Sequence, residues 1–147
     1  TNNGTTNNGT TNNGTTNNGT TGPVGDFIAA DVDGTRVLAT EEGGIEPMGE
    51  TVQLRKTTGE GSTPVRIFRI ALPSTDVATY DCATDPVSVI YSELSGQLIA
   101  NWTSSDTCTI EVTTSGDLVT GTFSASASDG STTIELTSGE FSLTPAQ

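Results

Sequence analysis

Residues 107–127 read TCTIEVTTSGDLVTGTFSASA and contain two segments in which apolar and polar side chains alternate. Side chains on a β-strand point to opposite faces with a period of two, so this alternation predicts strands with one buried and one solvated face. The segments are residues 107–113 and 118–127, and Ser115-Gly116-Asp117 between them is typical of a turn. The stretch therefore predicts two consecutive strands with the chain reversing between them.

The remainder of the chain after residue 22 follows the same plan. Further strands are predicted at residues 27–32, 36–40, 51–56, 65–72, 87–91, 98–102, 133–136 and 141–143. Asp33-Gly34 and Asp129-Gly130 are hairpin signals, and residues 41–49 are predicted to form an acidic loop around Pro47. No segment of 11 or more residues has the 3.6 periodicity of a helix. The pattern predicts an all-β fold, an antiparallel β-sandwich of about nine or ten strands, with a closed barrel as the alternative.

The apolar residues of these strands define the expected core. We expect the following side chains in or near it: Phe27, Val32, Val37, Leu54, Ile67, Phe68, Ile70, Val89, Tyr91, Ile99, Trp102, Ile110, Val112, Phe123, Ile134 and Phe141.

The N-terminal 20 residues are the pentapeptide TNNGT written four times. A segment of Thr, Asn and Gly buries too little apolar surface to offset the conformational entropy lost on ordering, so a flexible linker is one interpretation. The other two are a glycosylated stalk and an intersubunit strand. Residues 1–21 are therefore predicted to be a low-complexity extension and residues 22–147 the β-sandwich domain. Asparagine glycosylation sequences occur in the repeat and once in the domain, at Asn3, Asn8, Asn13, Asn18 and Asn101.

The charge balance excludes several classes of partner. The chain has 18 acidic and 5 basic residues, no His and a formal net charge of −13. Binding to nucleic acid or to an anionic membrane surface needs clustered Lys and Arg, which this sequence lacks. No apolar run is long enough to predict a transmembrane segment. The absence of His also excludes Ser-His-Asp catalysis and histidine-ligated zinc.

The two cysteines, Cys82 and Cys108, are predicted to form a disulfide. Closing a loop of this size would stabilise the fold by about 3.5 kcal/mol in the chain-entropy picture. Buried free thiols and a metal site are the alternatives, although a metal site would need further soft ligands that the sequence does not offer. A disulfide predicts an oxidising compartment, so we expect a secreted or cell-surface protein.

Few residues suggest chemistry beyond structure. The acidic loop carries four carboxylates, at Glu41, Glu42, Glu46 and Glu50, and a calcium site there is an alternative to a solvated surface. Two carboxylates meeting in space could hydrolyse a glycosidic bond, but no catalytic motif is present and we expect no enzyme and no cofactor other than that calcium. Trp102 and Tyr91 could stack on a sugar, with core packing as the commoner fate of such side chains.

Two short motifs near the C-terminus resemble a known pattern. Gly121-Thr122-Phe123 and Gly139-Glu140-Phe141, together with the opening hairpin of residues 27–34, are similar to small bacterial lipoprotein-like β-sandwich domains of unknown function. The resemblance covers residues 26–143. It implies an exported domain attached to the cell surface through a polar linker, and it implies no catalytic residues.

These observations together predict a non-enzymatic extracellular structural protein. It would be a subunit or decoration of a surface fibre or layer, self-associating through edge strands, with the N-terminal repeat as a glycosylated stalk or intersubunit connector. The alternative is a monomeric cell-surface module that binds a glycan, a small ligand or calcium.

Overall fold

The computed structural model describes residues 25–59 and 61–145, and these contain ten strands and no helix. The boundary predicted near residue 22 and the repeat lie outside the described residues. The strands are β2 (Phe27–Val32), β3 (Thr35–Ala39), β4 (Ile45–Met48), β5 (Thr51–Thr57), β6 (Val65–Leu72), β7 (Ala78–Asp81), β8 (Ser88–Ser95), β9 (Leu98–Thr114), β10 (Val119–Ser128) and β11 (Thr133–Leu143).

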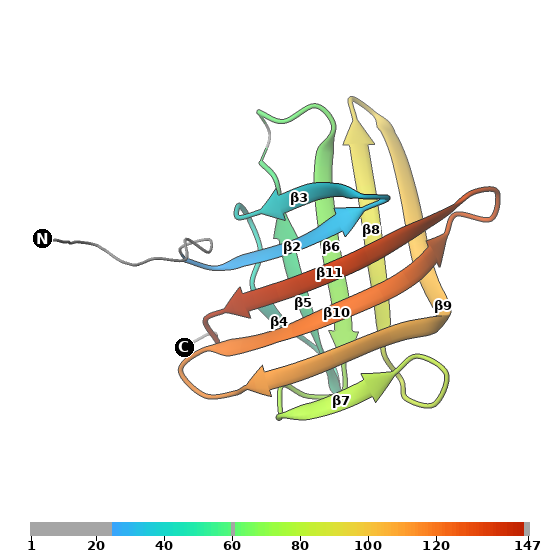
Figure 1. The fold of residues 1–147 in the computed structure, drawn as a ribbon. Helices are drawn as coiled ribbons and strands as arrows, with labels where there is room; N and C mark the ends of the chain where they lie inside the picture. The colour runs from blue at the N-terminus through green and yellow to red at the C-terminus, as the bar shows by residue number, and fades with distance from the viewer. Residues whose placement is uncertain (1–24, 60, 146–147) are drawn as a thin grey trace, which may run out of the picture.

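All ten strands belong to one antiparallel sheet that folds over onto itself. Its order is β3-β2-β11-β10-β9-β8-β6-β5-β4, and β7 pairs with the outer side of β9. Residues 98–103 of β9 pair with β8, whereas residues 103–114 pair with β10, so this 17-residue strand passes from one layer to the other. Figure 1 shows the front layer (β3, β2, β11, β10, the second half of β9 and β7) crossing the back layer (β8, β6, β5 and β4) at a large angle.

The predicted antiparallel sandwich is confirmed, with corrections to individual strands. The segments predicted at residues 98–102 and 107–113 are one strand, β9, and those at 133–136 and 141–143 are one strand, β11. The loop predicted at residues 41–49 contains β4, and β7 was not predicted at all. Within the described residues β3 and β4 form the two ends of the path and do not pair with each other, so the sheet is not a closed barrel. An isolated bridge joins Glu41, just after β3, to Thr57 of β5.

The core lies between the two layers and contains most of the predicted residues. Val32 and Trp102 are partly buried and pack against it, and Phe27 is buried. Two predictions are wrong. Ile99 is 65% exposed because the β8–β9 hairpin extends past the facing layer (Figure 1), and Ile67 faces outward because its neighbour Phe68 takes the inward position.

The two Gly-x-Phe motifs have a common structural role. Antiparallel pairing of β10 with β11 places Gly121 opposite Phe141 and Phe123 opposite Gly139. Each phenyl ring covers the glycine on the neighbouring strand: a Cβ at position 139 would lie 2.8 Å from Cδ1 and Cδ2 of Phe123. The motifs are thus reciprocal ring-over-glycine contacts in the core, which pin the register of these strands.

The predicted disulfide between Cys82 and Cys108 is confirmed. The register continues from β7 so that Cys82 lies opposite Cys108, with Cα atoms 5.1 Å apart and a backbone hydrogen bond from the Cys82 amide to the Cys108 carbonyl of 3.1 Å. The bond therefore fixes the end of the short edge strand β7 to β9.

Candidate functional site

The outer face of the front layer carries a shallow groove along β10. The outward positions of β10 are all small hydroxyl residues, whereas its inward positions are buried. They are Thr120, Thr122, Ser124, Ser126 and Ser128. Longer side chains stand on the neighbouring strands, so the hydroxyls of β10 form the floor and β9 and β11 supply the walls.

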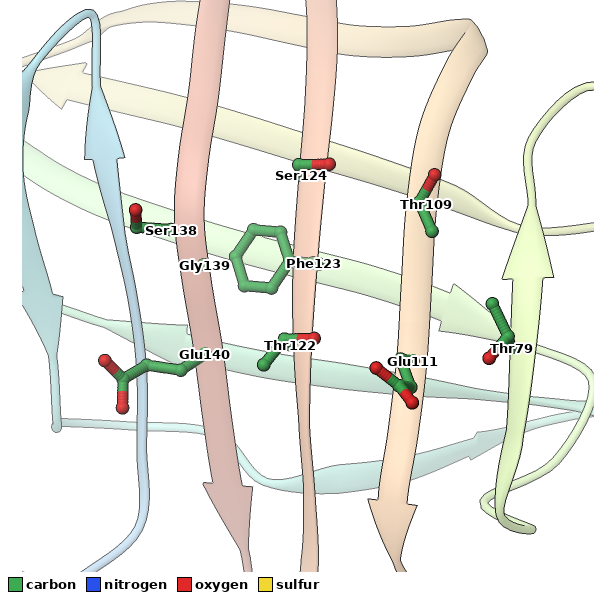
Figure 2. Close-up of a pocket in the computed structure, with 9 residues that line it drawn as sticks. All are labelled: Thr79, Thr109, Glu111, Thr122, Phe123, Ser124, Ser138, Gly139 and Glu140. Carbon is green, nitrogen blue, oxygen red and sulfur yellow. The ribbon is translucent and has the colours of Figure 1, made fainter.

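Cross-strand register aligns the walls. Thr79 of β7 lies opposite Glu111 of β9, Glu111 opposite Thr122 of β10, and Thr122 opposite Glu140 of β11. Because neighbouring strands are about 4.8 Å apart, the two glutamates arise from backbones about 10 Å apart. Figure 2 shows their carboxylates on either side of Thr122.

The groove consists of two adjoining hollows of about 480 and 230 Å³. Both include Thr109 and Ser124, and the second extends the groove along β10 toward Ser126 and Glu135. The lining side chains are hydroxyls and carboxylates, apart from Phe123 in the first hollow and Cys108, Ala125 and Leu136 in the second.

A β-bulge in β11 lies beside the groove. Phe123 pairs with Gly139 but Ala125 pairs with Leu136, so two residues of β11, Thr137 and Ser138, oppose the single residue Ser124. Ser138 has a φ of 49°, in the left-handed region that non-glycine residues rarely adopt. The bulge therefore places both Thr137 and Ser138 on the β11 wall beside Ser124.

Arg36 of β3 holds the bulge in place. Its Nη1 donates to the Ser138 carbonyl oxygen at 2.8 Å and lies 3.3 Å from Oδ1 of Asp31, while its Nη2 pairs with Glu140. A bulge leaves a backbone group outside the ladder, and here the guanidinium satisfies it. The charge of Glu140 is thereby balanced, whereas Glu111 has no ion-pair partner among the described residues.

A second polar cluster surrounds Tyr91 and Trp102. The Tyr91 hydroxyl donates to Oε2 of Glu93 at 2.7 Å, Nε of Arg66 lies 3.6 Å from the same oxygen, and the Trp102 indole donates to Oγ1 of Thr132 at 3.1 Å. Burial, followed by the hydrogen bond and the charge of Glu93, raises the pKa of Tyr91 well above its ordinary value.

The same cluster settles the orientation of the two aromatic side chains considered for sugar stacking. The rings of Tyr91 and Trp102 pack against each other with centroids 5.8 Å apart, and Tyr91 is almost completely buried. Core packing therefore describes this pair, which offers no exposed stacking platform.

The four glutamates of the acidic loop are not gathered around one point. Glu46 accepts a hydrogen bond from Gln53 and lies 3.9 Å from Arg55, and Glu41 packs against Gly59. The described part of the chain contains no group of three or more Cys, Asp or Glu side chains arranged to hold a metal ion. Calcium binding by the acidic loop stays a prediction, and the described residues show no preformed site for it.

Of the five glycosylation candidates, the structure describes one. Asn101 is exposed on β9, and its Oδ1 accepts a hydrogen bond from the Ser92 hydroxyl of β8. Asn3, Asn8, Asn13 and Asn18 lie outside the described residues.

Sequence reasoning missed the groove, although its floor is visible as the alternating hydroxyls of residues 120–128. The walls could not be found in that way, because Glu111, Glu135 and Glu140 come from two other strands and meet β10 only through register. No protein family, curated protein or solved structure matches the chain. Among the described residues no helix is long and apolar enough to cross a membrane.

Proposed function

We propose that this chain is a non-enzymatic extracellular structural protein, a subunit or decoration of a surface fibre or layer. In this proposal the N-terminal repeat of one copy pairs with a sheet edge of another. The observation that carries it is the outer edge of β3, with which no other strand of the described residues pairs, and the Cys82–Cys108 disulfide is compatible with the oxidising location that it requires.

The sheet has three edges in the described part of the chain, and they differ in how well they resist pairing. β4 has four residues and contains Pro47, which lacks an amide donor, and β7 has four residues and is fastened at its end by the disulfide. β3 has five residues and no proline, and no other strand of the described chain pairs with its outer side. A charged residue could still block it, but Arg36 turns across the sheet face toward Glu140.

The hairpin geometry identifies the backbone groups that β3 offers. Asp33 and Gly34 both have positive φ (47° and 88°), as in a type I′ turn, so the turn hydrogen bond joins Val32 and Thr35. Pairs in an antiparallel ladder alternate between bonded and non-bonded, so the amides of Arg36 and Leu38 point away from β2. These groups are the expected partners of an added strand.

The repeat is suited to this role in length and composition. Its 20 residues could reach about 66 Å when extended, and a five-residue strand needs only about 17 Å of that length. Small side chains without charge or proline allow backbone pairing at any register. Glycans on its asparagines would make the unpaired part a stalk.

The test is a comparison of assembly among variants of the full chain. Leu38→Pro removes an outward donor from β3, and Leu38→Ala is its matched control because Leu38 is 45% exposed and Ala keeps the amide. We expect the unmodified chain and Leu38→Ala to form fibres or sheets by negative-stain electron microscopy and large species in sedimentation velocity, and Leu38→Pro to stay dispersed.

A second measurement uses the repeat itself. A synthetic peptide of four TNNGT units, added in excess to the full chain, should cap the β3 edge and shorten or abolish assemblies. Deletion of residues 1–21 should have the same effect, with circular dichroism as the check on folding. Assembly that is unchanged by deletion of the repeat contradicts the connector role.

A further inference from the structure

The groove along β10 has the shape and chemistry of a binding site that lies apart from the β3 edge. We propose that it binds an uncharged linear saccharide chain, extended parallel to β10. This inference does not depend on assembly, because the groove occupies the outer face of the front layer and the proposed connector pairs with an edge strand.

The dimensions of the groove fit an extended chain rather than a compact ligand. Its floor runs from Thr122 through Ser124 to Ser126, a distance of about 14 Å at the rise of an antiparallel strand. The two hollows share Thr109 and Ser124, so they adjoin along this line and together exceed the length of a single sugar ring.

The polar groups of the groove match a ligand rich in hydroxyls. A carboxylate accepts from two donors at once, and Ser and Thr hydroxyls both donate and accept. Glu111 has no ion-pair partner among the described residues, so its two oxygens are available to neighbouring hydroxyls of a sugar ring. On the opposite wall the pairing with Arg36 fixes Glu140 in one orientation.

Electrostatics separates this ligand from the charged alternatives. Three glutamates, Glu111, Glu135 and Glu140, line a groove in a chain of net charge −13, so an anionic polysaccharide would be repelled. A metal ion would find no group of three or more Cys, Asp or Glu side chains arranged to hold it in the described residues. A neutral chain meets neither obstacle.

A protein partner is a poorer fit to the same surface. Protein interfaces depend on buried aromatic and apolar anchors, and the exposed side chains of the groove are hydroxyls and carboxylates. An added peptide strand would need free backbone groups, but β9, β10 and β11 already pair with one another here. The surface offers side-chain hydrogen bonds on rigid strands, which is what a saccharide uses.

The experiment is a titration of the ¹⁵N-labelled full chain carrying Leu38→Pro, the variant that is expected to stay dispersed, followed by amide chemical shifts. The probes are hexasaccharides of three uncharged polysaccharides (cellulose, xylan and mannan), a chitosan hexamer as the cationic comparison and an oligogalacturonate hexamer as the anionic one. We expect at least one uncharged probe to shift amides of residues 107–111, 122–126 and 135–140, and the anionic probe to leave them unchanged.

Variants then connect those shifts to the groove. Ser124→Tyr fills the floor and should abolish binding, while Ser95→Tyr, at an exposed position near the end of β8, should leave it unchanged. Glu111→Gln should weaken binding about tenfold, the size expected when a hydrogen bond to a charged group is weakened. Urea unfolding of each variant distinguishes loss of binding from loss of folding.

Several results would overturn the inference. Shifts caused equally by the oligogalacturonate, larger shifts with the chitosan hexamer than with any uncharged probe, shifts that survive Ser124→Tyr, or shifts confined to residues outside the groove would each contradict it. An absence of amide shifts with all the uncharged probes would also contradict the inference. Calcium-induced shifts in the groove would show that the groove binds a cation instead. Each outcome is independent of assembly, because the titrated chain carries Leu38→Pro and Leu38 does not line the groove.

Discussion

Replacing Gly139 by Ala tests the idea that the two Gly-x-Phe motifs lock β10 against β11. The new Cβ would lie 2.5 Å from the Phe123 carbonyl oxygen and 2.8 Å from two carbons of its ring, far inside ordinary contact distance. The ring can rotate but the paired carbonyl cannot move without breaking the ladder. Overpacking costs about 1–3 kcal/mol, and the lower entropy of the unfolded Ala chain offsets about 0.4–1 kcal/mol of it. We expect a net loss of about 1–2 kcal/mol in the free energy of unfolding.

The assay is equilibrium unfolding in urea with the disulfide intact, followed by the fluorescence of Trp102, the single tryptophan. The matched control is Gly44→Ala, because Gly44 does not have a positive φ and no atom lies within 4 Å of its added Cβ. This control should change the free energy of unfolding by less than about 0.5 kcal/mol.

A double-mutant cycle separates the ring from the backbone. Phe123→Ala alone should cost about 3–5 kcal/mol through the cavity it leaves. In the double variant the Ala methyl occupies part of that cavity, so the combined loss should be smaller than the sum by about 1 kcal/mol or more. Strict additivity, or a Gly139→Ala variant as stable as the Gly44→Ala control, refutes the reciprocal contact.

Three further predictions concern stability. Cys82→Ser combined with Cys108→Ser should lower the free energy of unfolding by about 3.5 kcal/mol in the chain-entropy picture, measured by urea titration against the oxidised protein. Ile110→Ala, at a fully buried position, should cost about 2–5 kcal/mol, whereas Ile99→Ala, at a position 65% exposed, should cost much less. Because the pKa of Tyr91 is raised in the folded chain, the unfolded chain loses the phenol proton at a lower pH, so the free energy of unfolding should fall as the pH rises above about 10. Tyr91→Phe should make this fall with pH less steep. An unchanged pH dependence in that variant would contradict the raised pKa of Tyr91.

Short-range patterns in the sequence predicted much of the fold. Alternation in residues 107–113 and 118–127 identified strands correctly, and Asp33-Gly34 was correctly expected to turn, because period-two burial and a positive φ are local properties. The disulfide was also predictable, because the chain contains only two cysteines.

The errors arose where one residue's environment depends on a distant segment. Ile99 is as apolar as the core residues, but it is exposed because the facing layer does not reach the end of the β8–β9 hairpin. Adjacent residues of one strand point to opposite faces, so Ile67 and Phe68 could not both enter the same core. Pro47 suggested a loop, yet a proline is tolerated on the edge strand β4.

The features of the candidate site likewise fall into those that are local in the sequence and those that depend on distant segments. Composition and the pattern of one strand are enough to predict the alternating hydroxyls of residues 120–128, the net charge of −13 and the absence of His. The positions of Glu111 and Glu140 on either side of Thr122, and of Arg36 at the bulge of Ser138, depend on the pairing of strands in the folded chain. These contacts join strands distant in the chain, and their register is set by core packing, including the reciprocal contacts of the two Gly-x-Phe motifs, rather than by any local propensity.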